Sequence, residues 1–354
     1  MSRKIFTIGA LAVLMLLGSV AQATVYRVNN APGVDADYTS VSAAVSAASA
    51  GDTLYVEGSN TSYGSITLSK RLIIVGPGYF LTVNDSTQAL KQPAQVTNIY
   101  FNSGSDGSVL YGMHITSRID INVDSVSIYR NRVNSNYSGN VIDIQSSLRD
   151  IVIAQNWLHS TYTSNRLIWI SDNCSGIFFA NNWISQDQNS EFGLNYSCSS
   201  NSYMAIEDQY SNSEVTYLNN VVRGNWECDG SLLINNIHVA GCGYYDGSTV
   251  FFNNLMHSSN FPAVGGNIQN VTMSTVFERV GVNWYSDDNW WKLATGSPAE
   301  GAGVNGGDCG MFGGGLSYKL SGMPPIPAIF EADVPATANK TNGMQIEVKS
   351  MSHK

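Results

Sequence analysis

The chain is short of charge, and of positive charge in particular. Charged residues make up 13% of its 354 positions, and 18 Lys and Arg residues stand against 27 Asp and Glu residues. Affinity for DNA or RNA depends on clustered Lys and Arg, and the sequence has no basic stripe. We therefore expect no nucleic-acid partner. So little charge suits a surface that meets neutral or polyhydroxylated partners.

Several motifs of catalysis and metal binding are also missing. The chain contains no C-x-x-C pair, no acidic run with calcium-loop spacing and no G-x-S-x-G. No metal ion or other cofactor is evident, and a nucleophilic hydrolase is a distant possibility. The cysteine count of five is odd, so at least one thiol is unpaired. The pairs Cys174–Cys198 and Cys228–Cys242, or a set of buried free thiols, remain equally open.

Long apolar segments are confined to the N-terminus. Arg3 and Lys4 precede the apolar stretch 5–17, and the small residues of an A-Q-A site follow at 21–23. This order is typical of a signal peptide, which we assign to residues 1–23. No later stretch approaches the ~20 apolar residues of a membrane span. We expect an exported protein without a membrane span, outside the cell, on its surface or in the periplasm.

One short phrase built around an asparagine recurs six times between residues 126 and 256. Its clearest copies are V-S-I-Y-R-N-R-V, I-V-I-A-Q-N-W-L and I-F-F-A-N-N-W-I. A strand followed by a polar turn, repeated at roughly 25 residues, is typical of a stacked solenoid. The repeated asparagines are Asn131, Asn156, Asn182, Asn220, Asn236 and Asn254.

The spacing of these asparagines is uneven. The intervals are 25, 26, 38, 16 and 18 residues. The interval of 38 indicates an ordinary repeat with an inserted loop over 186–202. The last two intervals look too short for the same three-strand repeat. We therefore expect the stack to narrow or change register after Asn220.

Both ends of the solenoid carry additional segments. Apolar residues recur with helical spacing over 41–48 and Gly51 follows, which predicts a short amphipathic helix that covers the first turn. Residues 24–315 form the predicted solenoid domain with this N-terminal cap. A tail module over 316–354 follows it.

Three features resemble the right-handed parallel β-helix proteins of the pectin-lyase-like fold. They are D-Y-T-S-V-S-A-A-V-S-A-A-S-A-G-D-T-L-Y-V with the later L-I-I-V-G-P-G-Y, the asparagine repeats, and S-P-A-E-G-A-G at 297–303. The resemblance implies an all-β, right-handed parallel β-helix solenoid with an N-terminal helical cap and a small C-terminal β tail. It implies no single activity, because lyases, hydrolases, esterases, adhesins and non-catalytic proteins share these features. The C-terminal module is similar to those of uncharacterised exported proteins of Bacteroidetes-type bacteria.

We interpret the six asparagines as structural. Stacked side-chain amides donate and accept along a column, so they satisfy turn groups that would otherwise be buried without a partner. The resemblance implies ladders of this kind inside the helix. Function is then expected on outward positions.

The asparagine register predicts one outward column. Thirteen residues before the first four asparagines lie Arg118, Asp143, Trp169 and Glu207, and the positions beside them are mostly isoleucine. Strand alternation buries the isoleucines and turns these four side chains to solvent, ~4.8 Å apart from one repeat to the next. Asp143 and Glu207 would then lie ~9.6 Å apart, close to the ~6.5–9.5 Å of an inverting glycosidase pair. They are the candidate catalytic residues.

A polysaccharide is the expected partner of this face, because sugars stack on aromatic rings and hydrogen-bond to carboxylates, amides and guanidinium groups. The inserted loop is expected to wall a groove over the column. The candidate binding residues are Arg118, Asp120, Gln145, Trp169, Gln209 and, in that loop, Tyr196.

Alternatives to a hydrolase stay open. A lyase would need a basic residue and a calcium ion or arginine beside a uronate carboxylate, and the few basic residues make such a groove less favoured. The main alternative to glycan binding is a non-catalytic cell-surface or structural, adhesin-like solenoid.

Two further sets of outward residues have structural interpretations. Arg132, Trp157 and Trp183 directly follow ladder asparagines, and they either grip a glycan or lie under a cover. Near the later repeats an apolar stripe predicts a cover by the tail from Leu316. The stripe consists of Phe178, Leu218, Leu232, Ile234, Val250 and Phe252.

Overall fold

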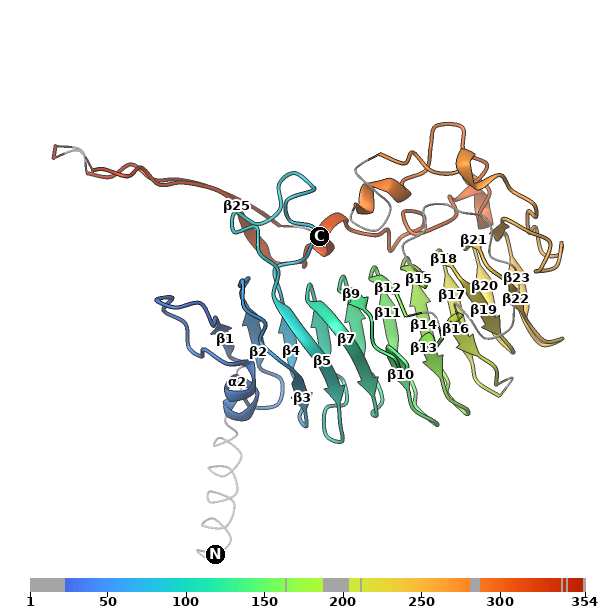
Figure 1. Cartoon of the computed structure of the whole chain (residues 1–354), viewed down its shortest axis with the longest axis horizontal. Coiled ribbons are helices and arrows are strands. Elements are labelled where there is room, and N and C mark those ends of the chain that lie inside the picture. The colour runs from blue at the N-terminus through green and yellow to red at the C-terminus, as the bar shows by residue number, and fades with distance from the viewer. Residues whose placement is uncertain are drawn as a thin grey trace, which may run out of the picture.

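The computed structural model describes residues 23–162, 164–186, 204–210, 212–280, 287–338, 340–341 and 343–352. The chain is mostly β, and its long parallel sheets curl into a half-barrel with a solenoid-like character (Figure 1). Almost all of the predicted signal peptide, and Tyr196 with most of its loop, lie outside the described residues. In the part of the chain that the structure describes, no helix is long and apolar enough to cross a membrane.

Ten parallel strands form the first sheet. In spatial order they are β1 (Val25–Val28), β2 (Thr53–Val56), β4 (Ile73–Val75), β6 (Val109–Tyr111), β8 (Ser127–Tyr129), β11 (Val152–Ala154), β14 (Ile177–Ala180), β17 (Val215–Leu218), β20 (Leu232–Ile234) and β23 (Val250–Phe252). One inward residue of each strand from β2 onward pairs with the equivalent residue of the next strand. These residues are at most 4% exposed, and together they line the core: Leu54, Ile74, Leu110, Ile128, Ile153, Phe179, Tyr217, Leu233 and Phe251.

The second sheet has 14 strands and two arms that separate after the long strand β7 (His114–Ile121). The first residues of β7 pair with one arm and its last residues with the other. The first arm is β9 (Arg132–Ser135), β12 (Trp157–Ser160), β15 (Trp183–Gln186), β18 (Val221–Arg223), β21 (Ile237–Ala240) and β24 (Leu255–Met256). The second arm is β10 (Ile142–Ile144), β13 (Arg166–Ile170), β16 (Met204–Asp208), β19 (Asn225–Cys228) and β22 (Gly243–Tyr244). On the other side of β7 lie β5 (Gln95–Phe101) and β3 (Ile66–Leu68).

Each repeat therefore supplies one strand to the first sheet and one to each arm, and the short repeats after Asn220 do so as well. The expectation that three strands would not fit there is wrong. Gly224 alone joins β18 to β19, with a φ of 128° that favours glycine. A Cβ on Gly241 would lie 2.2 Å from the carbonyl oxygen of Gly224, so the next turn needs glycine too. The expected change of register does occur, between Val222 and Arg223.

The N-terminal helix α2 (Val41–Ala47) contacts β1, β2 and β3. Ser40 is its N-cap and accepts a hydrogen bond from the backbone N–H of Ala43 at 3.3 Å. The apolar face of the helix is buried at Val41, Ala44 and Val45. A short amphipathic helix thus packs at the first turns of the stack, as its spacing predicts.

The C-terminal part of the chain runs back over the stack, as the orange and red trace of Figure 1 shows. It contains the 3-10 helices η1 (Met273–Thr275), η2 (Asp288–Trp291), η3 (Val304–Gly306) and η4 (Leu320–Gly322). We call residues 302–323 the return segment. It passes the turns before the first arm in reverse order, from the turn that precedes β24 to the turn that precedes β9.

The residue just before each ladder asparagine anchors this return segment. All six of these residues have φ between 53° and 59°: Arg130, Gln155, Asn181, Asn219, Asn235 and Asn253. Their side chains bond to backbone groups of Ala302, Val304, Asp308, Gly310, Met311, Gly313, Leu316, Ser317 and Met323. Left-handed turns aim these side chains out of the stack, where the returning backbone needs donors and acceptors.

The tail ends in an antiparallel hairpin of β25 (Pro327–Asp333) and β26 (Glu347–Ser352) that projects from the N-terminal half of the solenoid (Figure 1). It does not cover the apolar stripe near the later repeats. Val250 and Phe252 are 46% and 44% exposed. That predicted cover is wrong, because the return segment leads the tail back toward the early repeats.

Three cysteines are free, buried thiols: Cys174, Cys228 and Cys309. Neither Cys174–Cys198 nor Cys228–Cys242 is therefore formed. The alternative of buried free thiols holds for these three residues.

Candidate functional site: the outward column of the second arm

The strand pairing lines up outward side chains across β5, β7 and the second arm. Asp120 pairs with Asp143, Asp143 with Trp169, and Trp169 with Glu207. Isoleucines beside them face the core and are fully buried, at 119, 142, 144, 168, 170 and 206. We call the aligned set the outward column: Tyr100, Asp120, Asp143, Trp169, Glu207, Glu227 and Tyr244.

Arg118 is not a member of this column, and Asp120 takes the place predicted for it. Arg118 pairs with Asn98 on β5. The loop 122–126 after β7 is two residues shorter than the loop 145–151 after β10, so counting back thirteen residues from Asn131 overshoots by two. The prediction of Arg118 at this position is corrected accordingly.

Arg118 nevertheless reaches the column with its side chain. Its Nη2 lies 3.0 Å from Oδ2 of Asp120, and its Nη1 donates to the hydroxyl of Tyr137 at 3.1 Å. The guanidinium also lies over two aromatic rings, 5.3 Å from the centroid of Tyr100 and 5.2 Å from that of Tyr137. The first end of the column is thus an arginine held between tyrosines beside a carboxylate.

A second arginine organises the middle of the column. Arg166 binds Glu207 with two hydrogen bonds, from Nε at 2.5 Å and from Nη2 at 2.9 Å. Its guanidinium lies 4.6 Å from the ring centroid of Trp169. The indole N–H of Trp169 donates to Ser171 at 3.0 Å, and the ring packs edge-on against Tyr210. Nothing in the spacing of the sequence pairs Arg166 with Glu207, because 41 residues separate them.

The predicted catalytic carboxylates lie in the expected relation, two strand pairings apart with Trp169 between them. Their environments differ. Glu207 is 6% exposed and holds the Arg166 pair, while its Oε1 also accepts from Gln209 at 3.1 Å. Asp143 is half-buried, and desolvation raises the pKa of its carboxyl. Burial thus favours the neutral form of the Asp143 carboxyl, whereas Glu207 is held in an ion pair with Arg166.

Two neighbouring carboxyls have raised pKa values as well. Desolvation is the main cause of the raised pKa of Asp120, and the nearby charge of Asp143 adds to it. Desolvation also raises the pKa of Glu227, and Glu207 contributes through charge repulsion. Asp120 with Asp143, and Glu207 with Glu227, are direct neighbours in the pairing register. Sequence spacing did not single out Glu227, because it lies on a shortened repeat.

The remaining predicted binding residues are placed in part. Gln145 and Gln209 directly follow β10 and β16 and are exposed. Tyr196 lies outside the described residues, so its place over the column stays a prediction.

The predicted ladder asparagines form one buried column at the turn before the first arm. From Asn156 onward, each Oδ1 accepts from the backbone N–H of the preceding asparagine of the column, at 2.8 to 3.0 Å. The Oδ1 of Asn131 accepts from the backbone N–H of Met113 at 2.9 Å. Asn267 adds a seventh member, since its Oδ1 accepts from the backbone N–H of Asn254 at 2.9 Å. Sequence reasoning missed Asn267 because its repeat lacks the apolar phrase.

The residues after the ladder asparagines are covered. Trp157 and Trp183 are fully buried and stacked, with ring centroids 3.9 Å apart. Phe80 packs edge-on against Trp157, and Trp291 of η2 packs against Trp183. Arg132 lies 4.4 Å from the centroid of Phe80. This set stabilises the cover of the first arm and is not an open glycan surface.

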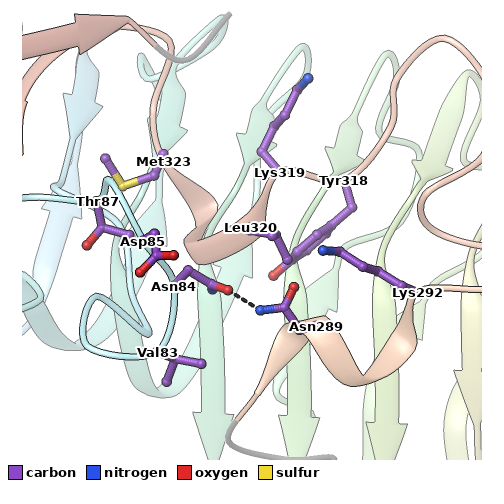
Figure 2. A pocket seen from close by; sticks show the side chains of 10 residues that line it. All are labelled: Val83, Asn84, Asp85, Thr87, Asn289, Lys292, Tyr318, Lys319, Leu320 and Met323. Atoms are coloured by element: carbon purple, nitrogen blue, oxygen red, sulfur yellow. Dashed lines mark hydrogen bonds between the residues drawn. The ribbon is translucent and has the colours of Figure 1, made fainter. Parts of the chain in front are cut away.

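A separate cavity of about 500 Å³ opens where this cover meets the loop after β4 (Figure 2). Asn84 and Asn289 hydrogen-bond across it, and Lys292, Tyr318 and Leu320 also line it. Beneath it, Asp288 accepts from Asn84 at 2.7 Å and from the backbone of Ser321 at 2.6 Å, and burial raises the pKa of Asp288 to about 6. These bonds join three distant segments, so we read this cavity as part of the cover.

Among the described residues, no group of three or more His, Cys, Asp or Glu side chains could hold a metal ion. Comparison of the chain with protein-family models, curated proteins and solved structures found no match. The function is therefore argued from the geometry of the outward column.

Proposed function

We propose that this protein is an exported right-handed parallel β-helix, with α2 as its N-terminal cap, that binds an extracellular polysaccharide along the outward column. The observation that carries the proposal is the unbroken register of aromatic and carboxylate side chains from Tyr100 to Tyr244. Strand pairing repeats every ~4.8 Å, so this column is a straight, regular surface that suits a repeating polymer.

The side-chain chemistry supports a sugar ligand. Trp169 offers an aromatic surface, and Asp143, Gln145 and Gln209 offer acceptors and donors for hydroxyl groups. Arg118 and Arg166 are held by ion pairs and aromatic rings, which fixes the positions of Asp120 and Glu207 before any ligand arrives. Groups held in place in advance bind with a smaller loss of conformational entropy.

Cleavage is the second part of the proposal. Asp143 would act as the acid, because its raised pKa favours the protonated form. Glu207 would serve as the carboxylate partner across Trp169, at the ~9.6 Å backbone separation of two strand pairings. Both oxygens of Glu207 already accept hydrogen bonds from Arg166, so they are less available to a water molecule. Binding is therefore the primary function and hydrolysis the secondary one.

A glycan array and a reducing-end assay test both parts. We expect the purified protein to bind at least one polysaccharide, and both Trp169→Ala and Asp143→Asn to weaken that binding. Asp106→Asn, at an exposed carboxylate in the loop between β5 and β6 and outside the pairing register of the column, is the matched control. Binding that survives both column variants would exclude this face. Binding without new reducing ends would leave the protein a non-catalytic glycan binder.

The exposed apolar residues Val250 and Phe252 favour a second candidate function, a non-catalytic surface or adhesin-like solenoid whose later repeats contact another protein. The same array separates the two candidates. An adhesin-like solenoid would bind no glycan, and its column variants would behave as wild type.

A further inference from the structure

The outward column carries more negative than positive charge. Its two arginines neutralise only part of the negative charge. Arg118 lies in ion-pair contact with Asp120, and Arg166 with Glu207. These two arginines are the only Lys or Arg residues on β5, β7 and the second arm, and desolvation lowers the pKa of His114 on β7 to about 3. Asp120 and Glu207 are thus neutralised locally.

Asp143 and Glu227 have no such ion pair. In the described part of the chain, neither has a Lys, Arg or His nitrogen within ion-pair distance, and both are half-buried rather than closed off. Desolvation raises the pKa of both carboxyls, and this effect weakens when a cation binds beside them. Among the described residues, each is a half-buried carboxylate without an ion pair of its own, and only the more distant Arg118 acts on Asp143 and Arg166 on Glu227.

Lysine is absent from the surrounding sequence. The chain has no lysine between Lys91 and Lys292, a stretch that contains the whole second arm. Glu227 is acted on by the negative charges of Glu207 and Asp229 and by the positive charge of Arg166, which already pairs with Glu207. Asp246 in turn acts on Asp229. A ligand that approaches the column therefore meets a negative potential along its length.

We infer, building on the binding part of the proposed function and not on cleavage, that the outward column recognises a glycan that carries free amino groups, with ammonium groups placed at the carboxylates of Asp143 and Glu227. An ammonium group offers three donors and a positive charge, which pairs with a carboxylate that has no ion pair among the described residues. A uronate would bring its own carboxylate against these two residues and be repelled. A neutral sugar would leave their charges unpaired.

The register adds a spacing requirement. Asp143 and Glu227 are three strand pairings apart, through Trp169 and Glu207, or ~14 Å along the column. This distance exceeds one sugar unit, so the two carboxylates contact amino groups on different units of one chain. Affinity then rises with the length of the oligosaccharide, because the second contact is intramolecular.

Titration calorimetry with three oligosaccharides of equal length tests the inference. The probes are a glucosamine oligomer, its fully N-acetylated counterpart and an oligogalacturonate. We expect the glucosamine oligomer to bind at least about tenfold more tightly than the other two, with affinity that falls as salt rises. Asp143→Asn and Glu227→Gln should each weaken this binding several-fold. Asp106→Asn, equal in charge change but off the column, should not.

The outcomes are distinct. Equal affinity for the acetylated oligomer, or tighter binding of the oligogalacturonate, overturns this inference but leaves glycan binding on the column in place. Equal loss in Asp106→Asn and the column variants also overturns it, since the attraction would then be general to an acidic protein. Binding of none of the three probes, together with an empty glycan array, overturns both the inference and the proposed function.

Discussion

The Oδ1 atom of Asn182 accepts two hydrogen bonds from Asn156, one from its backbone N–H at 2.9 Å and one from its side-chain amide at 3.0 Å. Its own amide donates to the carbonyl of Ile153 at 2.8 Å. One fully buried side chain thus satisfies three groups of the preceding turn. The same unit recurs along the ladder, so the stability of the stack depends on it.

Replacement of Asn182 by alanine should destabilise the protein by roughly 2–4 kcal/mol, because several buried polar groups lose their partners at once. Urea unfolding followed by circular dichroism measures this. Asn136→Ala, at an exposed position in the loop after β9, should change the free energy of unfolding by less than about 0.5 kcal/mol. Equal effects of the two substitutions would contradict the role of the ladder.

Asn219 tests the anchoring of the return segment. Its amide donates to the carbonyls of Asp308 at 2.9 Å and Gly310 at 3.2 Å, and its φ is 55°. Asn219→Gly keeps the backbone conformation and loses the bonds, with an expected cost of roughly 1–3 kcal/mol. Asn219→Ala should cost about 1 kcal/mol more, because alanine resists a left-handed conformation. Thermal unfolding of the three proteins gives both differences, and no loss in the glycine variant would show that the bonds do not stabilise the fold.

Buried histidines should make the fold sensitive to acid. Desolvation lowers the pKa of His114, His159 and His238 to about 3, while in the unfolded chain a histidine titrates near 6.5. The unfolded state therefore binds more protons between these values. Their contribution to stability is complete above pH 6.5 and is lost as pH falls toward 3, by about 1.4 kcal/mol per pH unit for each histidine. His238→Gln should reduce the slope of unfolding free energy against pH, measured by urea titrations from pH 7 to pH 5.

Asp208 should change the pH dependence of stability in the direction opposite to that of the histidines. It is fully buried inside the stack, accepts from Ser231 at 2.5 Å, and desolvation raises its pKa to about 7. The folded state then binds a proton that the unfolded state releases above about pH 4. Its effect on stability is favourable at low pH and is lost as pH rises from about 4 to 7. The free energy of unfolding of Asp208→Asn, taken relative to that of the wild type, should therefore be higher at pH 7.5 than at pH 4.5. A difference between the two proteins that does not change with pH would contradict the shifted pKa.

Much of the stack is predictable because its repeat is local. Each ladder asparagine follows its strand at a constant offset, so the six positions and the inward isoleucines could be read from the sequence. The alignment of Asp143, Trp169 and Glu207 followed from the same offset. In those three repeats a longer loop is followed by a shorter strand, so each residue lies thirteen positions before its ladder asparagine. The offset failed at Arg118, because the loop after β7 is two residues shorter than the loop after β10.

The tertiary contacts of the site could not be predicted from the sequence. Arg166 lies over Trp169 and binds Glu207 only because pairing of β13 with β16 brings them together across the inserted loop. The return segment is bound through its backbone carbonyls and the backbone N–H of Val304, which no side-chain pattern reveals. Its anchors vary among Arg, Gln and Asn, so the turn positions at Arg130 and Gln155 do not look like members of one set.

The amino-acid sequence by itself thus determined the repeat, the buried asparagine ladder and which face of the second arm points outward, because period and strand alternation are local properties. Only the tertiary structure decided which outward residues share a row, which carboxylates the two arginines neutralise and where the tail runs. Those depend on loop lengths and on contacts between distant segments. The position of Asp143 and Glu227 outside the two ion pairs of the column is a result of that three-dimensional arrangement.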